Sequence, residues 1–148
     1  MPNMLRNVLA VLAGLVIGSA VNMALITMSA SIIPPPAGVN VSDPDSLSAG
    51  IGLFTPRHFL FPFLAHALGT LAGALTAYLI AASHRVQVAY AVGVLFLCGG
   101  IAAVFMIPAP TWFVAADLLL AYLPMAWVAV QIGARVKQGN DGARAQAA

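Results

Sequence analysis

The sequence predicts an all-α integral membrane protein, folded as a bundle of four transmembrane helices. Of its 148 residues, 61% are hydrophobic and 7% are charged, whereas soluble domains carry about 25% charged residues. Four apolar runs each reach the length of about 20 residues that a membrane helix needs. A chain this short cannot bury so much apolar surface in a core of its own, so the lipid bilayer is its expected partner.

The first span is expected at about 8–33. Its apolar run is far longer than the roughly 7–15 apolar residues of a secretory signal peptide, so we expect it to remain as a helix. The prolines at 34–36 end it. Ala10, Gly14 and Gly18 recur at every fourth position, a spacing that lets membrane helices approach closely.

The segment 34–57 is the one sizeable loop, and it contains the start of a short helix. Asp43 is a favourable N-cap, Pro44 suits the first helical position, and Asp45 places an acid in the first turn. We expect this helix to lie at the outer membrane interface and to cover the mouth of the bundle. A movable lid is the alternative.

The second span is expected at about 58–82 and ends at the polar turn Ser83–Arg85. Pro62, near its start, leaves the carbonyl of His58 without a helical donor. One face of this span carries small residues at every fourth position, which predicts close contact with another helix. These residues are Ala65, Gly69, Gly73, Ala77 and Ala81.

The third and fourth spans are expected at about 86–107 and 112–135, separated by a turn that contains Pro108 and Pro110. Pro124 lies in the middle of the fourth span and removes one backbone hydrogen bond, so it predicts a kink there. Membrane helices tolerate such kinks where neighbouring groups satisfy the freed carbonyl.

Residues 1–137 are thus expected to form a single four-span domain, followed by a disordered cytoplasmic tail over 138–148. If both termini lie inside, every Lys and Arg except Arg57 lies on the cytoplasmic side, as the positive-inside rule requires. The pattern predicts an N-in/C-in, multi-pass protein of a bacterial-type inner (plasma) membrane.

Asp117 is the one formally charged side chain in the interior of a predicted span. A carboxylate at membrane depth is costly, so such groups are paired, protonated or functional. At 1.5 Å per residue from the span ends, Asp117 lies about 8 Å, His66 about 12 Å and Asn22 about 16 Å below the outer surface. Three different spans therefore place polar groups in the outer half of the membrane.

Two further residues flank this cluster: His58 lies above it at the mouth, and Tyr122 lies just over one turn below Asp117. The candidate ligand-binding or polar-network residues are Asn22, His58, His66, Asp117 and Tyr122. A His–Asp pair can share a proton or act in acid–base catalysis, so His66 and Asp117 are also the candidate catalytic residues. The alternative is a network of hydrogen bonds that only joins the helices.

Other site chemistries lack support in the sequence. Cys98 is the single cysteine, which excludes an intrachain disulfide and a cysteine-rich metal site. His58 and His66 lie on one span and His84 lies at the opposite membrane face, so a bis-histidine haem site is not expected. The dispersed basic residues form no nucleic-acid-binding patch. We expect no metal, no cofactor and no nucleic-acid partner.

The sequence alone specifies no activity. We expect an accessory or binding protein with an intramembrane polar site, which the small-residue stripes would also let pack in a homo-oligomer or a larger membrane complex. One alternative is a small ion- or proton-linked transporter or channel. A polar track across the bundle would favour this alternative. The other is a membrane enzyme acting on a lipophilic substrate by His/Asp acid–base chemistry. A cavity lined by His66 and Asp117 would favour binding or catalysis.

Overall fold

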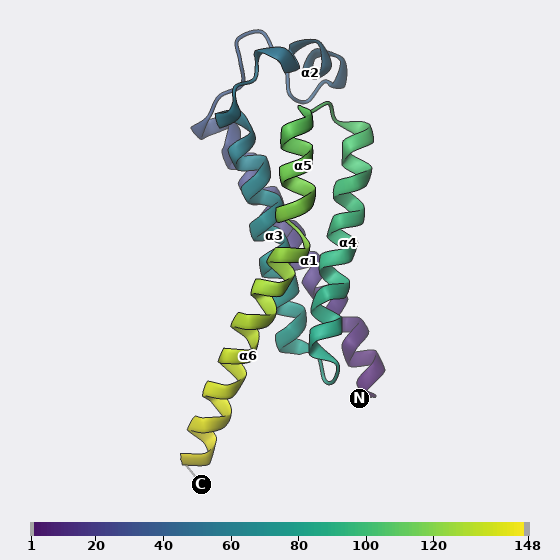
Figure 1. The fold of residues 1–148 in the computed structure, drawn as a ribbon, viewed down its shortest axis with the longest axis vertical. Helices are drawn as coiled ribbons and strands as arrows, with labels where there is room; N and C mark the ends of the chain where they lie inside the picture. The colour runs from purple at the N-terminus through teal and green to yellow at the C-terminus, as the bar shows by residue number, and fades with distance from the viewer. Residues whose placement is uncertain (1, 147–148) are drawn as a thin grey trace.

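A computed structural model describes residues 2–146 of the protein as an all-helical bundle, with no strand among those residues (Figure 1). Four stretches of it are long and apolar enough to cross a membrane, which confirms the all-helical composition and the four long apolar helices that the sequence predicts. These are Asn3–Ile32, Pro56–Ile80, Arg85–Met106 and Thr111–Asn140. The corresponding helices are α1 (Asn3–Ile32), α3 (Leu60–Ile80), α4 (Arg85–Met106), α5 (Thr111–Leu120) and α6 (Leu123–Gln146).

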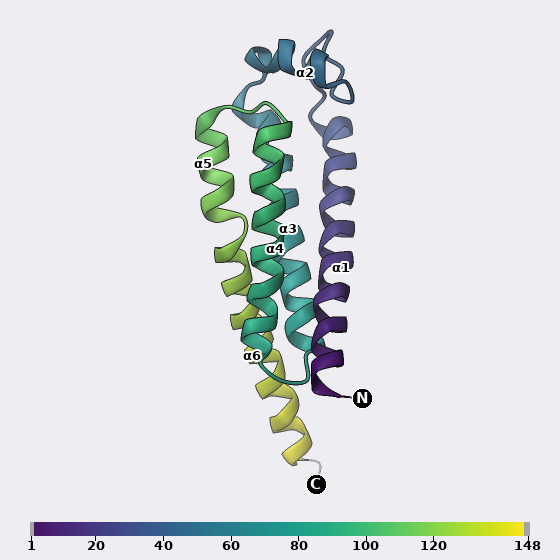
Figure 2. The ribbon, with the colours of Figure 1, turned by 90° about the vertical axis from the view of Figure 1, so that its right-hand side faces the viewer.

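The two ends of the bundle differ. The first and last described residues lie at one end, which we call the terminal end, and the loop that carries α2 (Pro44–Gly50) lies at the other, which we call the α2 end (Figure 1). The helix α3 is central, because it packs against α1, α4 and α6. Figure 2 shows α1 and α5 on opposite sides of this arrangement, with α6 running obliquely toward the terminal end.

Glycines allow α1 and α3 to touch along their backbones. A Cβ atom built on Gly14 would lie 2.6 Å from the carbonyl oxygen of Gly73, and one built on Gly18 would lie 2.6 Å from that of Gly69. Such distances are too short for any side chain. The two small-residue stripes of the sequence therefore face each other, as their spacing indicates.

In the terminal half of the bundle, α4 and α6 complete a core of small side chains around α3. Because most of these side chains are short, the helices pack closely against one another. The buried members are Ala10, Ala74, Ala77, Tyr78, Ala81, Val88, Ala89, Val92, Ala126, Ala129 and Val130.

The N-terminal part of α1 holds the α3–α4 turn at the terminal end. The side-chain oxygen of Asn7 accepts a hydrogen bond from the Ala82 amide at 3.0 Å, and its nitrogen donates to the Ser83 hydroxyl at 3.2 Å. Arg6 donates from Nε to the Ile80 carbonyl at 2.8 Å. His84 takes a left-handed conformation with φ of 51° and reverses the chain. Orphan groups at the end of α3 are thereby satisfied.

The predicted short helix in the loop is present as α2. The Asp43 side chain accepts hydrogen bonds from the amides of Asp45 and Ser46, which is the N-cap arrangement that the sequence indicates. Two short 3₁₀ helices, η1 (Ile51–Leu53) and η2 (Pro56–Phe59), then lead into α3. This loop folds back over the α2 end of the bundle (Figure 2).

The fourth span is broken into two helices. Pro124 has no N–H to donate to the carbonyl of Leu120, and the chain departs from helix between α5 and α6, at Ala121 and Tyr122. The sequence predicts a kink from Pro124, and the structure has a full interruption. The break allows the side chains of Asp117 and Tyr122 to meet, although they are five residues apart.

The C-terminal end differs from the sequence prediction of a disordered tail over 138–148. The helix α6 continues to Gln146, and residues 147–148 lie outside the described part of the chain. The residues Gly139, Asn140, Asp141 and Gly142 are poor helix formers, so the local sequence does not explain this continuation of the helix.

Candidate functional site

The structure brings His66 of α3 and Asp117 of α5 into direct contact. The Nδ1 atom of His66 lies 2.9 Å from each carboxylate oxygen of Asp117. The Asp117 residue is 4% exposed, whereas the His66 side chain is 26% exposed. The buried carboxylate thus has a partner, as burial of such a group requires, and the imidazole retains an accessible edge.

Tyr122 completes the hydrogen bonding of the carboxylate. Its hydroxyl donates to Oδ2 of Asp117 at 2.9 Å, and its ring stacks on the His66 imidazole with centroids 5.8 Å apart. A Cβ atom on Gly100 of α4 would overlap the Tyr122 ring, with 2.6 Å to Cζ. Only glycine leaves room for the tyrosine here, so α4 also helps to position the group.

Thr70 lies one turn below His66 and was not singled out from the sequence. Its side chain is fully buried, and its hydroxyl donates to the carbonyl of His66 at 2.7 Å. A threonine in a helix commonly satisfies itself in this way, so the sequence carries no specific signal for its place in the site. Among the side chains that the structure describes, every buried N or O atom has a hydrogen-bond partner.

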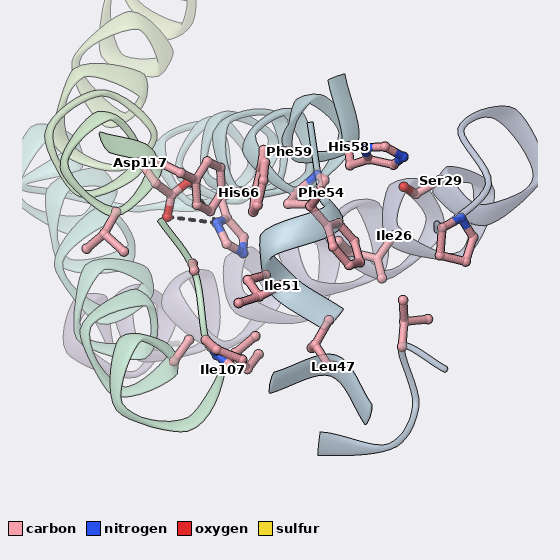
Figure 3. Close-up of a pocket in the computed structure, with 18 of the residues that line it drawn as sticks. Ile26, Ser29, Leu47, Ile51, Phe54, His58, Phe59, His66, Ile107 and Asp117 are labelled. Carbon is pink, nitrogen blue, oxygen red and sulfur yellow. Dashed lines mark hydrogen bonds and ion pairs between the residues drawn. The ribbon is translucent and has the colours of Figure 1, made fainter. Parts of the chain in front are cut away.

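His66 and Asp117 line a cavity of about 330 Å³ at the α2 end (Figure 3). Its walls come from α1, α3, α4 and α5, and the loop residues Leu47, Ile51 and Phe54 cover it. The walls are apolar except at Ser29, His58, His66 and Asp117. The full lining is Ile26, Ser29, Ala30, Ile33, Pro35, Val41, Leu47, Ile51, Phe54, His58, Phe59, Pro62, His66, Gly100, Ala103, Val104, Ile107, Pro108, Ala109, Phe113, Val114 and Asp117.

The two ring nitrogens of His66 face different surroundings, one the hydrogen-bond network and the other the cavity. Nδ1 faces the Asp117 carboxylate, and the other ring nitrogen points away from Asp117 toward the side on which Ile51 lies (Figure 3). Nε2 is therefore the nitrogen of the His66 imidazole that is free to contact a molecule in the cavity. The carboxylate behind it fixes the orientation of the ring.

His58 lines the cavity near the loop but takes no part in the Asp117 network. Its Nδ1 atom accepts a hydrogen bond from the Thr55 amide at 3.0 Å, and its ring meets Phe54 edge-on with centroids 5.3 Å apart. These contacts form a capping box at the start of η2. The predicted place of His58 at the mouth of the bundle matches this arrangement, and its contacts are local to the loop.

Asn22 is the predicted site residue that the structure does not join to the others. It is half-buried on α1, with its Cβ against Gly69 of α3. It neither lines the cavity nor belongs to the hydrogen-bonded group of His66, Asp117 and Tyr122. Its depth was estimated by counting along the span, which says nothing about whether the side chain reaches its neighbours.

Two further observations limit what the site can do. No group of three or more His, Cys, Asp or Glu residues within the described part of the chain is placed to hold a metal ion. The buried polar or charged side chains found there are Thr70 and Asp117, so the polar group does not continue as a track into the terminal half.

Comparisons with family models, with curated proteins and with solved structures found no match to this chain.

Proposed function

We propose that the protein crosses a membrane four times and binds a lipophilic molecule in the cavity at the α2 end. The four apolar helices support the membrane placement. The basic residues near the terminal end support an N-in/C-in orientation in a bacterial-type inner membrane, with the α2 end outside. The cavity would then lie in the outer half of the bilayer.

The observation that carries this proposal is a mostly apolar cavity with the His66–Asp117 pair in its wall. Small-molecule sites are concave and apolar, with a few polar groups that orient the ligand, and they measure roughly 300–1,000 Å³. At about 330 Å³, this cavity suits a small molecule or one end of a longer one. A purely structural network would need no space beside it.

Transport is less well supported than binding. A pathway for an ion or proton needs polar groups or water across the membrane. Between Thr70 and the terminal end, the described core consists of alanine, valine and glycine with Tyr78. A transporter would therefore need a second copy or another partner to supply the remaining route.

Acid–base catalysis on the bound molecule is a second candidate function. The observation that favours it is the orientation of the His66 imidazole. Its Nδ1 contacts Asp117, and the opposite edge of the ring faces the cavity. This is the arrangement of a general acid or base with an orienting carboxylate. In that case the molecule carried by a His66→Gln variant should differ in mass from the one carried by the parent, because the substrate would accumulate.

Native mass spectrometry of the detergent-purified protein tests the binding proposal. We expect a noncovalent lipophilic adduct on the parent. Ala103→Phe should abolish it, because Ala103 lines the cavity and the larger ring would fill it. Ala102→Phe is the matched control, since Ala102 lies on the same helix, is exposed and does not line the cavity. Equal adducts on all three proteins would contradict the proposal.

A further inference from the structure

The number of protons on the His66–Asp117 pair decides what its free nitrogen offers. With one proton, located on Nδ1 between the ring and the carboxylate, the pair carries a net charge of −1 and Nε2 is a lone-pair acceptor. With two protons, one bridges Nδ1 and the carboxylate and the other resides on Nε2. The pair is then neutral overall, and Nε2 is a donor whichever side of the bridge holds the shared proton.

The surroundings favour the neutral, two-proton form. Asp117 is 4% exposed and lies within an apolar span, where an uncompensated charge is expensive. The lining of the cavity includes no Lys or Arg in the described part of the chain, and His58 is its other titratable side chain. Tyr122 contributes a hydroxyl hydrogen bond to the carboxylate but no positive charge. A second proton on the pair would supply the compensating charge without any other cation.

We infer that His66 presents an Nε2–H donor to the cavity and that the ligand is an uncharged lipophile with a carbonyl oxygen, such as a long-chain ketone or ester. This inference rests on the proposed binding function. The carbonyl accepts the hydrogen bond from Nε2, and the hydrocarbon part contacts the apolar walls. An anionic ligand would restore the net charge that the pair avoids. A cation would find the Asp117 carboxylate already occupied by His66 and Tyr122.

The position of the cavity gives such a molecule access from the bilayer. The helices α1 and α4 approach each other near Gly14 and Gly18, where the α4 side chains Val92 and Phe96 meet the glycine positions. Toward the α2 end, the facing residues of the two helices line the cavity instead. Ile26 of α1 and Val104 of α4 are each 38% exposed there. The chain of the ligand can extend between these residues into lipid while its carbonyl reaches His66.

Infrared spectroscopy of a labelled probe tests the donor directly. The probe is 2-hexadecanone with ¹³C at its carbonyl, added to the full-length protein in lipid nanodiscs. Because a donated hydrogen bond weakens the C=O bond, we expect a band at lower frequency than in protein-free nanodiscs. Ala103→Phe should remove this band by excluding the probe. In His66→Phe, any probe that still binds should show a carbonyl band without the frequency shift.

The outcomes separate the two proposals. If the probe binds in an Ala103→Phe-sensitive way but its carbonyl band is unshifted, the donor inference is wrong and the binding function stands. If the ketone does not bind while the purified protein still carries an adduct sensitive to Ala103→Phe, the proposed ligand class is wrong. If neither the ketone nor any adduct responds to Ala103→Phe, the binding function itself is contradicted.

A second measurement is independent of whether the His66→Phe protein folds. In ¹⁵N-histidine-labelled parent protein at neutral pH, solid-state NMR should show a directly bonded proton on Nε2 of His66. The resonances of the other two histidines can be assigned with His58→Asn and His84→Asn. A His66 Nε2 without a bonded proton would overturn the inference.

Discussion

The two halves of α3 show how one helix builds both a tightly packed region and a cavity. In the terminal half its packing face is Gly73, Ala77 and Ala81, all buried against neighbouring helices. In the α2 half the same helix contributes Pro62 and His66 to the wall of the cavity, and Phe59 of η2 lines it just before the helix begins. Small residues let backbones touch and leave no space, whereas large and branched residues keep the helices apart.

The difference also explains where a charged residue is tolerated. In the described core of the terminal half, a carboxylate would meet mainly alanine and valine side chains, with Tyr78 as the one buried side chain there that carries a hydroxyl. At the break between α5 and α6, Asp117 finds both His66 and Tyr122. We therefore expect substitutions in the terminal half to affect folding, and substitutions around Asp117 to affect both stability and ligand binding.

The largest expected effect on stability is that of Gly73→Leu, which places a large side chain in the closely packed terminal half. A Cβ at Gly73 would lie 2.6 Å from the carbonyl oxygen of Gly14, and backbone cannot move aside cheaply. Overpacking of this kind costs about 3 kcal/mol of stability or more. The measurement is thermal unfolding in detergent. Gly99→Leu is the control and should be nearly neutral, because no atom lies within 4 Å of a Cβ there.

A smaller effect is expected for Asp117→Ala, which removes the centre of the polar group. His66 Nδ1 and the Tyr122 hydroxyl lose their partner, and each unsatisfied buried group costs about 1–3 kcal/mol. We expect a net loss of about 2 kcal/mol together with loss of the adduct on the native protein. Asp45→Ala, on the exposed loop, should change neither quantity. An Asp117→Ala protein with parental stability would show that the network does not hold the α2 half together.

The sequence predicts the fold from local signals. Apolar runs, proline-containing turns and the Asp43 cap are each read from neighbouring residues, and they give the four long helices and the short α2. The sequence also makes His66 and Asp117 a candidate pair, because both lie at similar depth in the outer half, but it leaves open whether the two side chains meet. These inferences need only helical geometry.

The cavity could not be predicted, because it depends on long-range contacts. Leu47, Ile51 and Phe54 cover it only because the loop folds back over the bundle. The sequence places a short helix over the mouth of the bundle, but it does not specify that a cavity remains beneath this cover. The full break at Ala121 and Tyr122 likewise exceeds the kink expected from Pro124 alone. Neither feature leaves a signal within a single helix.

The smallest expected effect is that of Asn22→Ala. The sequence predicts that Asn22 belongs to the polar cluster, whereas the structure leaves it outside the group of His66, Asp117 and Tyr122. Asn22 contacts Gly69 through its Cβ, which alanine retains, and its side chain has no part in the Asp117 network. We expect a stability change within about 0.5 kcal/mol and an unchanged adduct in native mass spectrometry. Loss of the adduct would place Asn22 in the site after all.

The most direct test of cavity binding is photolabelling of the protein in a bilayer with a long-chain ketone that carries a diazirine in its hydrocarbon chain, a few carbons away from the carbonyl. After proteolysis, we expect labelled peptides from the cavity-lining stretches of α1 (26–33) and α4 (100–107), and we expect excess 2-hexadecanone to suppress that labelling. Labels spread evenly over exposed faces such as Val16 and Leu119, and unaffected by the competitor, would contradict binding in the cavity.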